Sequence, residues 1–337
     1  MVFSLFTCHF SLFTFHCSLV TFHFSLFTFH FNIMPAPLIV ITGPTATGKT
    51  KLAARVAAAT DGEIISADSR QVYRGMDVGS GKDYGDYMVD GYLVPYHLID
   101  IVDPGHEYNV YEFQQDFLKA YNHIIKRNKQ AVLCGGTGLY IEAAIGRYKL
   151  LNVPANPTLR KKMLGMTWEE LTAKLESMRP LHNSTDTTNR DRLLRAIEIE
   201  TFNREHASER NNYPEFNTSI FAIHLDRQEI RDRITSRLKN RLERGMTEEI
   251  EQLLKGGVST EQLSFYGLEY RYLTQYLTGE IKYDEMFNTL NTAIHQFAKR
   301  QMTWFRRMER KGYKLHWIDG NLPMEEKTRK IVESLRC

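Results

Sequence analysis

The sequence predicts an α/β fold, a doubly wound parallel sheet with a helical insertion. Short apolar runs rich in β-branched residues alternate with helical patterns along most of the chain, as in parallel sheets that are covered by helices on both faces. Between about residues 153 and 216 the strand signal disappears and charged helical segments take its place. We therefore expect a core formed by residues 34–152 and 217–337, with the insertion at 153–216.

The core strands are expected at four apolar runs. They are Leu38–Ile41, Glu63–Ser66, Ala131–Cys134 and Phe221–Leu225. The first strand leads through a glycine-rich loop into an alanine-rich helical stretch at Lys51–Ala59. Apolar residues at helical spacing from Val110 to Ile124 predict a helix before the third strand. This order of strand, helix and strand is what a parallel sheet requires.

Two long helices are expected in the second half of the chain. The first is basic and runs from about Gln228 to Leu254. The last long helix is expected to bury one face and to present a basic face elsewhere. Its apolar face contains Phe287, Leu290, Ile294, Phe297 and Trp304, and its basic residues are Lys299, Arg300, Arg306 and Arg307.

The first 33 residues differ from the rest. From Ser4 to Phe31 a seven-residue unit repeats four times, with one histidine in each unit. A signal peptide would need a basic start and a cleavage site, and neither is present. A membrane span would not carry histidines at regular intervals. A metal-binding repeat is disfavoured because one histidine in every seven residues brings too few ligands to one ion. We interpret residues 1–33 as a low-complexity extension, disordered or non-native, upstream of a start at Met34.

Composition and cysteine use fit a cytoplasmic protein without a membrane anchor. The net charge is only +3, so a nucleic-acid partner would have to be held by local basic patches. The four cysteines form no C-x-x-C pair and no zinc-site spacing, which indicates a reducing compartment.

The most informative motif is GPTATGKT, between the first expected strand and the following helix. This context is typical of a P-loop, and it predicts a P-loop NTPase-like sheet. Its glycines allow a tight turn, so that backbone amides from Thr45 onward can converge on phosphate oxygens, while Lys49 adds positive charge and the Thr50 hydroxyl can ligate Mg²⁺. The expected phosphate-binding residues are Gly43, Thr45, Ala46, Thr47, Gly48, Lys49 and Thr50.

An acidic partner for the magnesium ion is harder to find. The strand at Ala131–Cys134 ends in Gly135-Gly136-Thr137-Gly138 rather than in aspartate, and Asp100 is a weaker candidate. This disfavours nucleotide hydrolysis, although a P-loop kinase of a small metabolite stays open. Asp68 follows the second strand beside the P-loop, where it can act as a general base or simply as a turn residue.

Six segments taken together resemble the tRNA dimethylallyltransferases, also called tRNA isopentenyltransferases. They are GPTATGKT, SADSRQVYRGMDVGSGK, HLIDIVDP, GGTGLY, RLLRAIEI and AKRQMTWFRR. The resemblance covers about Leu38 to Trp317. It implies transfer of a dimethylallyl group from dimethylallyl diphosphate to the exocyclic amine of the adenosine 3′ of a tRNA anticodon. In this family the P-loop holds the departing diphosphate rather than ATP.

The resemblance also implies roles for individual residues. Asp68 looks like the base that accepts the amine proton, and Thr137 resembles the family's contact to the reacting nucleotide. Arginines on the insertion can pair with phosphates or stack on bases, and tyrosine offers a stacking face. The residues that fall on tRNA-contacting segments are Asp68, Ser69, Arg70, Gln71, Thr137, Arg160, Asp191, Arg192, Arg195, Gly267, Tyr270 and Arg271.

Two segments depart from the family pattern. GSGKD replaces the commoner Gly-Thr-Ala-Lys-Pro, which leaves Lys82 in place but makes the loop geometry uncertain, and GLEYRYL is longer than the usual Gly-Tyr-Arg spacing. No Cys/His finger follows Trp317, so we expect a bacterial-type enzyme, acting as a monomer. Besides the kinase, two alternatives stay open: an enzyme acting on free adenine nucleotides and a non-catalytic RNA-binding protein.

Overall fold

The computed structural model describes residues 37–146, 148–181, 187 and 189–335. Its main sheet has six strands in the order β5-β2-β6-β1-β7-β8, and every neighbouring pair is parallel. The strands are β1 (Leu38–Thr42), β2 (Gly62–Ser66), β5 (Tyr96–His97), β6 (Gln130–Gly135), β7 (Thr218–His224) and β8 (Leu315–Asp319). The interpretation of residues 1–33 concerns a segment outside the described residues.

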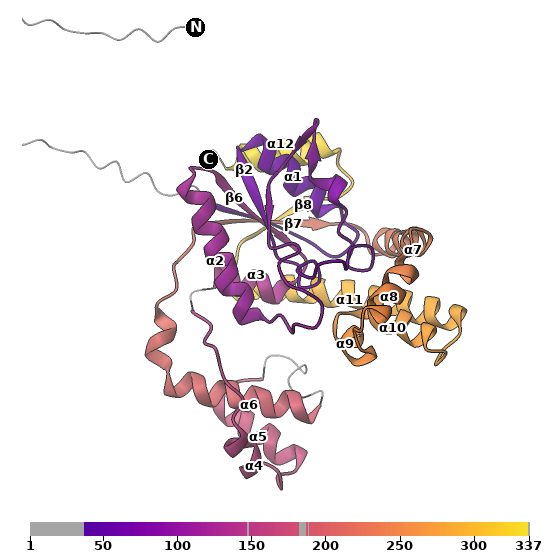
Figure 1. The fold of residues 1–337 in the computed structure, drawn as a ribbon. Helices are drawn as coiled ribbons and strands as arrows, with labels where there is room; N and C mark the ends of the chain where they lie inside the picture. Colours follow the sequence, from indigo (N-terminus) through magenta and orange to yellow (C-terminus); the bar gives the residue numbers. More distant parts are fainter. Residues whose placement is uncertain (1–36, 147, 182–186, 188, 336–337) are drawn as a thin grey trace, which may run out of the picture. The chain divides into compact units, whose positions relative to one another are not determined.

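Helices cover both faces of this sheet (Figure 1). Alternate residues of β1 point to opposite sides: Ile39 and Ile41 pack in one core cluster and Val40 in another. Helices α1 (Lys49–Ala59) and α12 (Met324–Ser334) contribute to the first cluster. Helices α2 (Val110–Lys126), α3 (Gly138–Ile145) and α11 (Tyr283–Arg310) contribute to the second. The predicted doubly wound parallel sheet is confirmed.

Strand register fixes which loops meet. Ile41 of β1 pairs with Cys134 of β6, and Ser66 of β2 pairs with the same Cys134. The three strands therefore end at the same level of the sheet, and the loops that follow them lie side by side. Ligands of open α/β sheets bind at this carboxyl edge.

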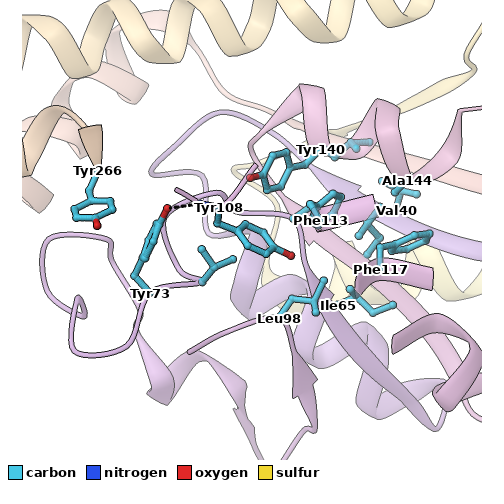
Figure 2. Close-up of a cluster of buried hydrophobic side chains, with 14 of the residues drawn as sticks. Val40, Ile65, Tyr73, Leu98, Tyr108, Phe113, Phe117, Tyr140, Ala144 and Tyr266 are labelled. Carbon is cyan, nitrogen blue, oxygen red and sulfur yellow. Dashed lines mark hydrogen bonds between the residues drawn. The ribbon is translucent and has the colours of Figure 1, made fainter. Parts of the chain in front are cut away.

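A group of buried aromatic rings supports the loop that follows β2 (Figure 2). The Tyr108 amide donates to the Tyr73 hydroxyl at 3.2 Å, and the Tyr73 ring packs 4.5 Å from the Tyr266 ring. Deeper in the cluster, the rings of Phe113 and Tyr140 stack at 4.2 Å. These contacts fasten the loop both to α3 and to the end of α9 (Thr260–Phe265).

Described residues between β6 and β7 form helices and no strand. The helices are α3, α4 (Pro157–Lys162), α5 (Trp168–Met178), α6 (Arg190–Glu205) and a 3₁₀ turn, η3 (Ala207–Asn211). Side chains of Asn156, Thr167 and Asn189 cap α4, α5 and α6 by accepting from first-turn amides. A separate small core holds α4–α6 together, formed by Met163, Leu171, Leu175, Leu193, Ala196 and Ile197.

Several predicted elements need correction. The basic helix is two helices, α7 (Arg227–Glu243) and α8 (Met246–Lys255), because Gly245 between them adopts the left-handed conformation, with φ 90°. Helix α10 (Leu268–Leu277) follows α9. The short turn η1 (Tyr84–Tyr87) and the hairpin β3 (Met88–Val89) and β4 (Tyr92–Leu93) were not predicted, nor were β5 and β8.

The buried face of α11 is also shifted from the prediction. Leu290 and Ile294 are buried as expected, but Phe297 is 38% exposed. Arg307, expected on the basic face, instead donates to the buried Glu142 carboxylate at 2.6 Å and lies over the Trp304 ring. The buried residues are Met286, Leu290, Ile294, Ala298, Gln301, Phe305 and Met308. Within the described residues, no helix is long and apolar enough to cross a membrane.

Candidate functional site

The P-loop is a tight turn between β1 and α1. Gly43 and Gly48 have φ of 152° and 75°, values that favour glycine, and Ala46 also has a positive φ of 63°. The Thr47 hydroxyl and the Lys49 ammonium both donate to the Pro44 carbonyl, at 2.8 and 3.2 Å. No side chain caps the N-terminus of α1, and its first turn holds no acidic residue. These features make the N-terminus of α1 suitable for binding an anion.

Charges of both signs act on Lys49. Burial lowers the pKa of Lys49, Cys134 and Asp68 oppose this effect, and the charges of Arg237 and Arg241 on α7 lower the pKa further. A helix far away in sequence therefore brings two arginines into the electrostatic range of the P-loop. Sequence reasoning missed both residues, because nothing in a basic helix indicates which arginines face a distant loop.

Asp68 and Thr137 lie together at the neighbouring strand ends. The Thr137 hydroxyl accepts from the Ser69 amide at 3.3 Å, and the Ala67 amide donates to the Cys134 carbonyl at 2.7 Å. One Asp68 carboxylate oxygen accepts from the Arg70 amide at 2.9 Å. This bond is the turn contact that was the alternative interpretation of Asp68. It also fixes the Asp68 carboxylate next to Ser69, whose amide donates to Thr137.

The residues after Asp68 are tied to other parts of the fold. Gln71 is only 9% exposed, and its amide donates to the Gly81 carbonyl at 3.2 Å. Arg70 donates to the Phe265 carbonyl at 2.9 Å, and a Cβ at Gly267 would lie 3.0 Å from Arg70 Nε. The structure thus brings Arg70 and Gly267 together, although they are separated widely in sequence.

Helix α11 completes the P-loop through Gln301. Its side-chain oxygen accepts from the Thr45 amide at 2.9 Å, and its side-chain nitrogen donates to the Gly136 carbonyl at 2.9 Å. A Cβ at Gly136 would lie 2.5 Å from Gln301 Nε2, and one at Gly138 would lie 2.2 Å from the Trp304 ring. The glycines after β6 are therefore needed because α11 packs directly on them.

Lys82 is a buried structural lysine. Its side chain has no exposed surface, and it donates to the Tyr73 carbonyl at 2.5 Å, to Asp77 at 2.8 Å and to Asp100. Tyr84 donates a further hydrogen bond to Asp100 at 2.6 Å. Asp100, the weaker candidate for supporting magnesium, is thus engaged by a lysine and a tyrosine. The described residues include no group of three or more His, Cys, Asp or Glu placed to hold a metal ion.

The prediction that Tyr270 offers a stacking face to tRNA is wrong in this structure. Tyr270 is 1% exposed, and its hydroxyl donates to Glu249 at 2.8 Å. The Glu249 carboxylate also accepts from the consecutive amides of residues 77, 78 and 79, at 2.7, 2.6 and 3.0 Å. Tyr270 therefore holds the carboxylate that shapes the loop after Asp68. Burial and the nearby Glu249 raise its pKa well above the ordinary value.

Two arginines predicted to contact tRNA pair with the same buried carboxylate. Arg160 donates to both oxygens of Glu198, at 2.7 and 3.1 Å, and Arg195 donates to one of them at 3.2 Å. Burial of Glu198 disfavours its ionised form, but these hydrogen bonds and one from the Asn156 amide outweigh burial and hold its pKa at about 2. Arg160 and Arg195 thus have a structural role within the insertion.

The other predicted tRNA contacts lie at helix starts and surfaces. Asp191 and Arg192 are in the first turn of α6, where the Arg192 amide donates to the Asn189 cap at 2.8 Å. Arg271 is exposed on α10, over the Tyr272 ring at 5.7 Å, and Gly267 precedes α10 with φ 137°. Asp191, Arg192 and Arg271 are exposed and Gly267 is partly exposed, and the roles of these residues stay predictions.

A glycine-rich loop that joins the first strand of a parallel sheet to a helix, with Lys49 and Thr50 at its end, defines a P-loop protein. Comparison with known proteins is more specific. Residues 71–308 match the IPP transferase family and residues 36–89 match the isopentenyl transferase family. The chain belongs to the IPP transferase family.

Individual relatives agree with this assignment. A protein of Bacteroides fragilis named tRNA dimethylallyltransferase 2 is 54% identical over 89% of this chain and 98% of its own length. A Parabacteroides distasonis protein named tRNA dimethylallyltransferase 1 is also 54% identical, over 86% and 94% of the two chains. The crystal structure of the tRNA isopentenylpyrophosphate transferase of Bacillus halodurans has a TM-score of 0.65 at 30% identity and covers 89% of this chain and 97% of its own.

Proposed function

We propose that this chain transfers a dimethylallyl group from dimethylallyl diphosphate to the exocyclic amine of the adenosine 3′ of the anticodon in tRNA, releasing diphosphate. The observation that carries the proposal is the meeting of a P-loop, a carboxylate and a hydroxyl at one sheet edge: Lys49, Asp68 and Thr137 follow three adjacent strands. The names of the relatives supply the substrate class.

The reaction assigns a role to each of these groups. As the adenine amine attacks the allylic carbon, the bond from that carbon to the diphosphate oxygen breaks and the amine loses a proton. Asp68 would accept this proton, while Lys49 and the P-loop amides would stabilise the charge that develops on the diphosphate. Thr137, whose hydroxyl meets the loop of Asp68, would contact the reacting nucleotide.

Magnesium fits the site as a partner of the substrate. Thr50 lies in the first turn of α1, where its hydroxyl can ligate a cation, and no cluster of carboxylates in the described residues would bind the ion alone. The diphosphate oxygens would contribute further ligands. When bound, Mg²⁺ would neutralise charge on the leaving diphosphate.

The tRNA would be held by basic residues on several elements. Lys299, Arg300 and Arg306 are exposed on α11, and Arg271 is exposed on α10. The target base must leave its stack, and Ser69, Arg70 and Gln71 border the point where its edge would meet Asp68. We propose that the enzyme acts as a monomer. We place the reaction in the cytoplasm.

Nucleoside analysis of tRNA tests the proposal. Unmodified tRNA is incubated with the full chain, dimethylallyl diphosphate and Mg²⁺, digested and examined by mass spectrometry. We expect a prenylated adenosine that is absent when the donor or the protein is omitted. Two results would contradict the proposal: steady ATP hydrolysis without tRNA, which indicates a kinase-like enzyme, and prenylation of free adenine nucleotides with none in tRNA.

A further inference from the structure

The turn that contains Asp68 is anchored to a distant part of the chain by Arg70. The Arg70 amide donates to one Asp68 carboxylate oxygen at 2.9 Å, and the Arg70 guanidinium donates to the Phe265 carbonyl, also at 2.9 Å. Phe265 is the last residue of α9, where carbonyls lack a partner within the helix and an arginine can supply one. Arg70 therefore holds the carboxylate through its backbone and α9 through its side chain.

Gly267 provides the space for this contact. A Cβ at Gly267 would lie 3.0 Å from Nε, 3.3 Å from Cζ and 3.5 Å from Cδ of Arg70, so a larger residue would press on the guanidinium group. Gly267 has φ 137°, which also favours glycine, and α10 begins at the next residue. The side chain of Arg70 thus lies at the junction of α9 and α10, which we define as residues 265–267.

Other contacts hold this junction against the same loop without Arg70. Tyr266 is 1% exposed, and its ring packs 4.5 Å from the Tyr73 ring (Figure 2). The Tyr266 hydroxyl accepts from the Gly105 amide. Arg70 itself is partly exposed, so replacing it should not prevent folding. What Arg70 adds is a direct connection between the junction and the turn of Asp68.

The position of this turn matters for proton transfer. A general base must lie within hydrogen-bond distance of the group that loses a proton, and a displacement of about 1 Å can slow a reaction about 10²-fold. Asp68 follows β2, whereas Arg271, an exposed residue predicted to contact tRNA, lies on α10. Arg70 joins these two elements through one side chain. It can therefore fix the distance between an RNA bound on α10 and the carboxylate.

We propose that Arg70 is a positioning residue for prenyl transfer. Its side chain ties the turn that holds the Asp68 carboxylate to the junction of α9 and α10, so that the base and the bound tRNA share one support. Arg70 thus acts through Asp68 and not as a contact to RNA. The inference rests on the proposed function, in which Asp68 is the base, and it replaces the role that the family resemblance implies for Arg70.

The first test is Arg70→Met in the full chain, which keeps much of the side chain and removes its hydrogen bond. Single-turnover rates at saturating tRNA and dimethylallyl diphosphate measure prenyl transfer, and filter binding measures Kd for tRNA. We expect the rate to fall about tenfold, as for loss of one hydrogen bond of a charged group. The Kd for tRNA and the KM for dimethylallyl diphosphate should stay within about twofold. An unchanged rate would overturn the proposal.

The conservative variant Arg70→Lys tests the hydrogen bond itself. A lysine can donate to the same carbonyl but lacks the planar guanidinium, so this variant should recover part of the rate. Recovery would assign the loss to the contact with Phe265. A lysine variant as slow as Arg70→Met would contradict the role of this hydrogen bond.

A matched control is Arg74→Met, on the same loop. The Arg74 guanidinium donates to the Asp103 carboxylate at 2.9 Å and to the Ile101 carbonyl at 3.1 Å, and both partners lie outside α9. Its loss should leave the rate of prenyl transfer within about twofold. Equal losses in Arg70→Met and Arg74→Met would reduce the effect to general support of the loop and overturn the proposal.

The salt dependence of tRNA binding tests the alternative, in which Arg70 contacts a phosphate. Loss of one phosphate contact reduces the slope of log Kd against log salt concentration by about one. Arg70→Met should keep the slope of the native chain, measured by filter binding between about 50 and 200 mM salt. A smaller slope together with weaker binding would assign Arg70 to RNA and overturn the proposal.

A double-mutant cycle tests whether Arg70 acts through Asp68. In Asp68→Asn the base is absent, so adding Arg70→Met should slow the residual reaction by less than about twofold. Losses that multiply would show that Arg70 acts independently of the base, as a purely structural residue would, and would overturn the proposal. Thermal melts of the four proteins ensure that all rates are compared well below the melting temperatures.

Failure of this inference can be told apart from failure of the proposed function. Prenylation of tRNA at equal rates by the native chain and by Arg70→Met would reject the role of Arg70 and leave the reaction in place. Absence of prenylation by the native chain would reject the reaction. The Kd and the salt slope of Arg70→Met would then still decide whether Arg70 contacts RNA.

Discussion

At the carboxyl edge of the sheet the residues predicted for chemistry are held by backbone, whereas in the insertion the arginines predicted to bind tRNA are held by a carboxylate. Asp68 and Thr137 are bound through the amides of Arg70 and Ser69. Arg160 and Arg195 are bound by the side chain of Glu198. The sheet thus brings the strand-end residues together, whereas the arginines are engaged within the insertion.

The electrostatic balance differs in the same way. Around the P-loop, burial lowers the pKa of Lys49, the charges of Cys134 and Asp68 raise it, and those of Arg237 and Arg241 lower it. In the insertion, Glu198 has its negative charge satisfied by two arginines and a backbone amide. Lys49 is thus subject to opposing charges, whereas the charge of Glu198 is matched by its hydrogen-bond partners. Each prediction below tests one side of this contrast.

The largest effect is expected from Asp68→Asn. The asparagine oxygen can still accept from the Arg70 amide, so the loop should keep its shape, but no base remains. We expect kcat for prenyl transfer to fall by about 10²–10⁴, with tRNA affinity unchanged, as measured by single-turnover assay and filter binding. The exposed Asp90 serves as control, since Asp90→Asn should keep full activity. Normal turnover in Asp68→Asn would remove Asp68 as the base.

A pH-dependent loss of stability is expected in the insertion. The folded-state pKa of Glu198 is about 2, below its ordinary value of 4.5, so its stabilising effect is present above pH 4.5 and is lost as the pH falls toward 2. At neutral pH this amounts to at most about 3 kcal/mol. Glu198→Gln should therefore unfold more easily than the native chain at pH 7.

Thermal melts of the two proteins from pH 7 to pH 2 provide the measurement. The difference in their free energies of unfolding should close between pH 4.5 and pH 2, because the native carboxyl becomes protonated there. A difference that stays constant across this range would show that the ion pairs of Arg160 and Arg195 contribute nothing to stability.

A smaller effect is expected from Gln301→Leu. The change leaves the Thr45 amide and the Gly136 carbonyl without their partner, and each unsatisfied buried group costs about 1–3 kcal/mol. The kcat/KM for dimethylallyl diphosphate should fall about tenfold through a looser P-loop. Met302→Leu, the neighbouring position on α11, is the control. Unchanged kinetics in Gln301→Leu would mean that the P-loop keeps its shape without α11.

The smallest effect is expected from deleting residues 1–33. All site residues described above lie between residues 43 and 306. Activity and melting temperature should match those of the full chain in parallel assays. A loss of either would give the seven-residue repeat a function.

Local sequence patterns were enough to predict much of the fold and part of the candidate site. The β1–P-loop–α1 unit was predictable because its strand, its glycines and its helix are consecutive. The meeting of Asp68 with Thr137 followed from the rule that parallel strands end at one edge. The short strand β5 could not be predicted, because it has too few residues to show an alternating pattern. The break between α7 and α8 could not be predicted either, because it depends on the backbone conformation of Gly245.

Local patterns could not predict contacts between segments that are distant in the sequence. Glu249 binds the amides of residues 77–79 across about half of the chain, and this contact decides that Tyr270 is buried rather than exposed to RNA. The fit of Arg241 against Gly81, which leaves no room for a Cβ there, is of the same kind. In each case the charged residue looks like any solvated helix residue until the packing of α7, α8 and α10 is known.

The Gln301 bridge has a consequence for the way the protein is made. A polypeptide grows from its N-terminus, and Thr45 is synthesised 256 residues before the side chain that accepts its amide hydrogen. Strand β8, which follows α11, covers the edge of β7 later still. An unfinished chain thus carries the whole P-loop sequence without the Gln301 contact. Premature termination before α11 would leave a polypeptide that contains every glycine of the motif and lacks the assembled phosphate site.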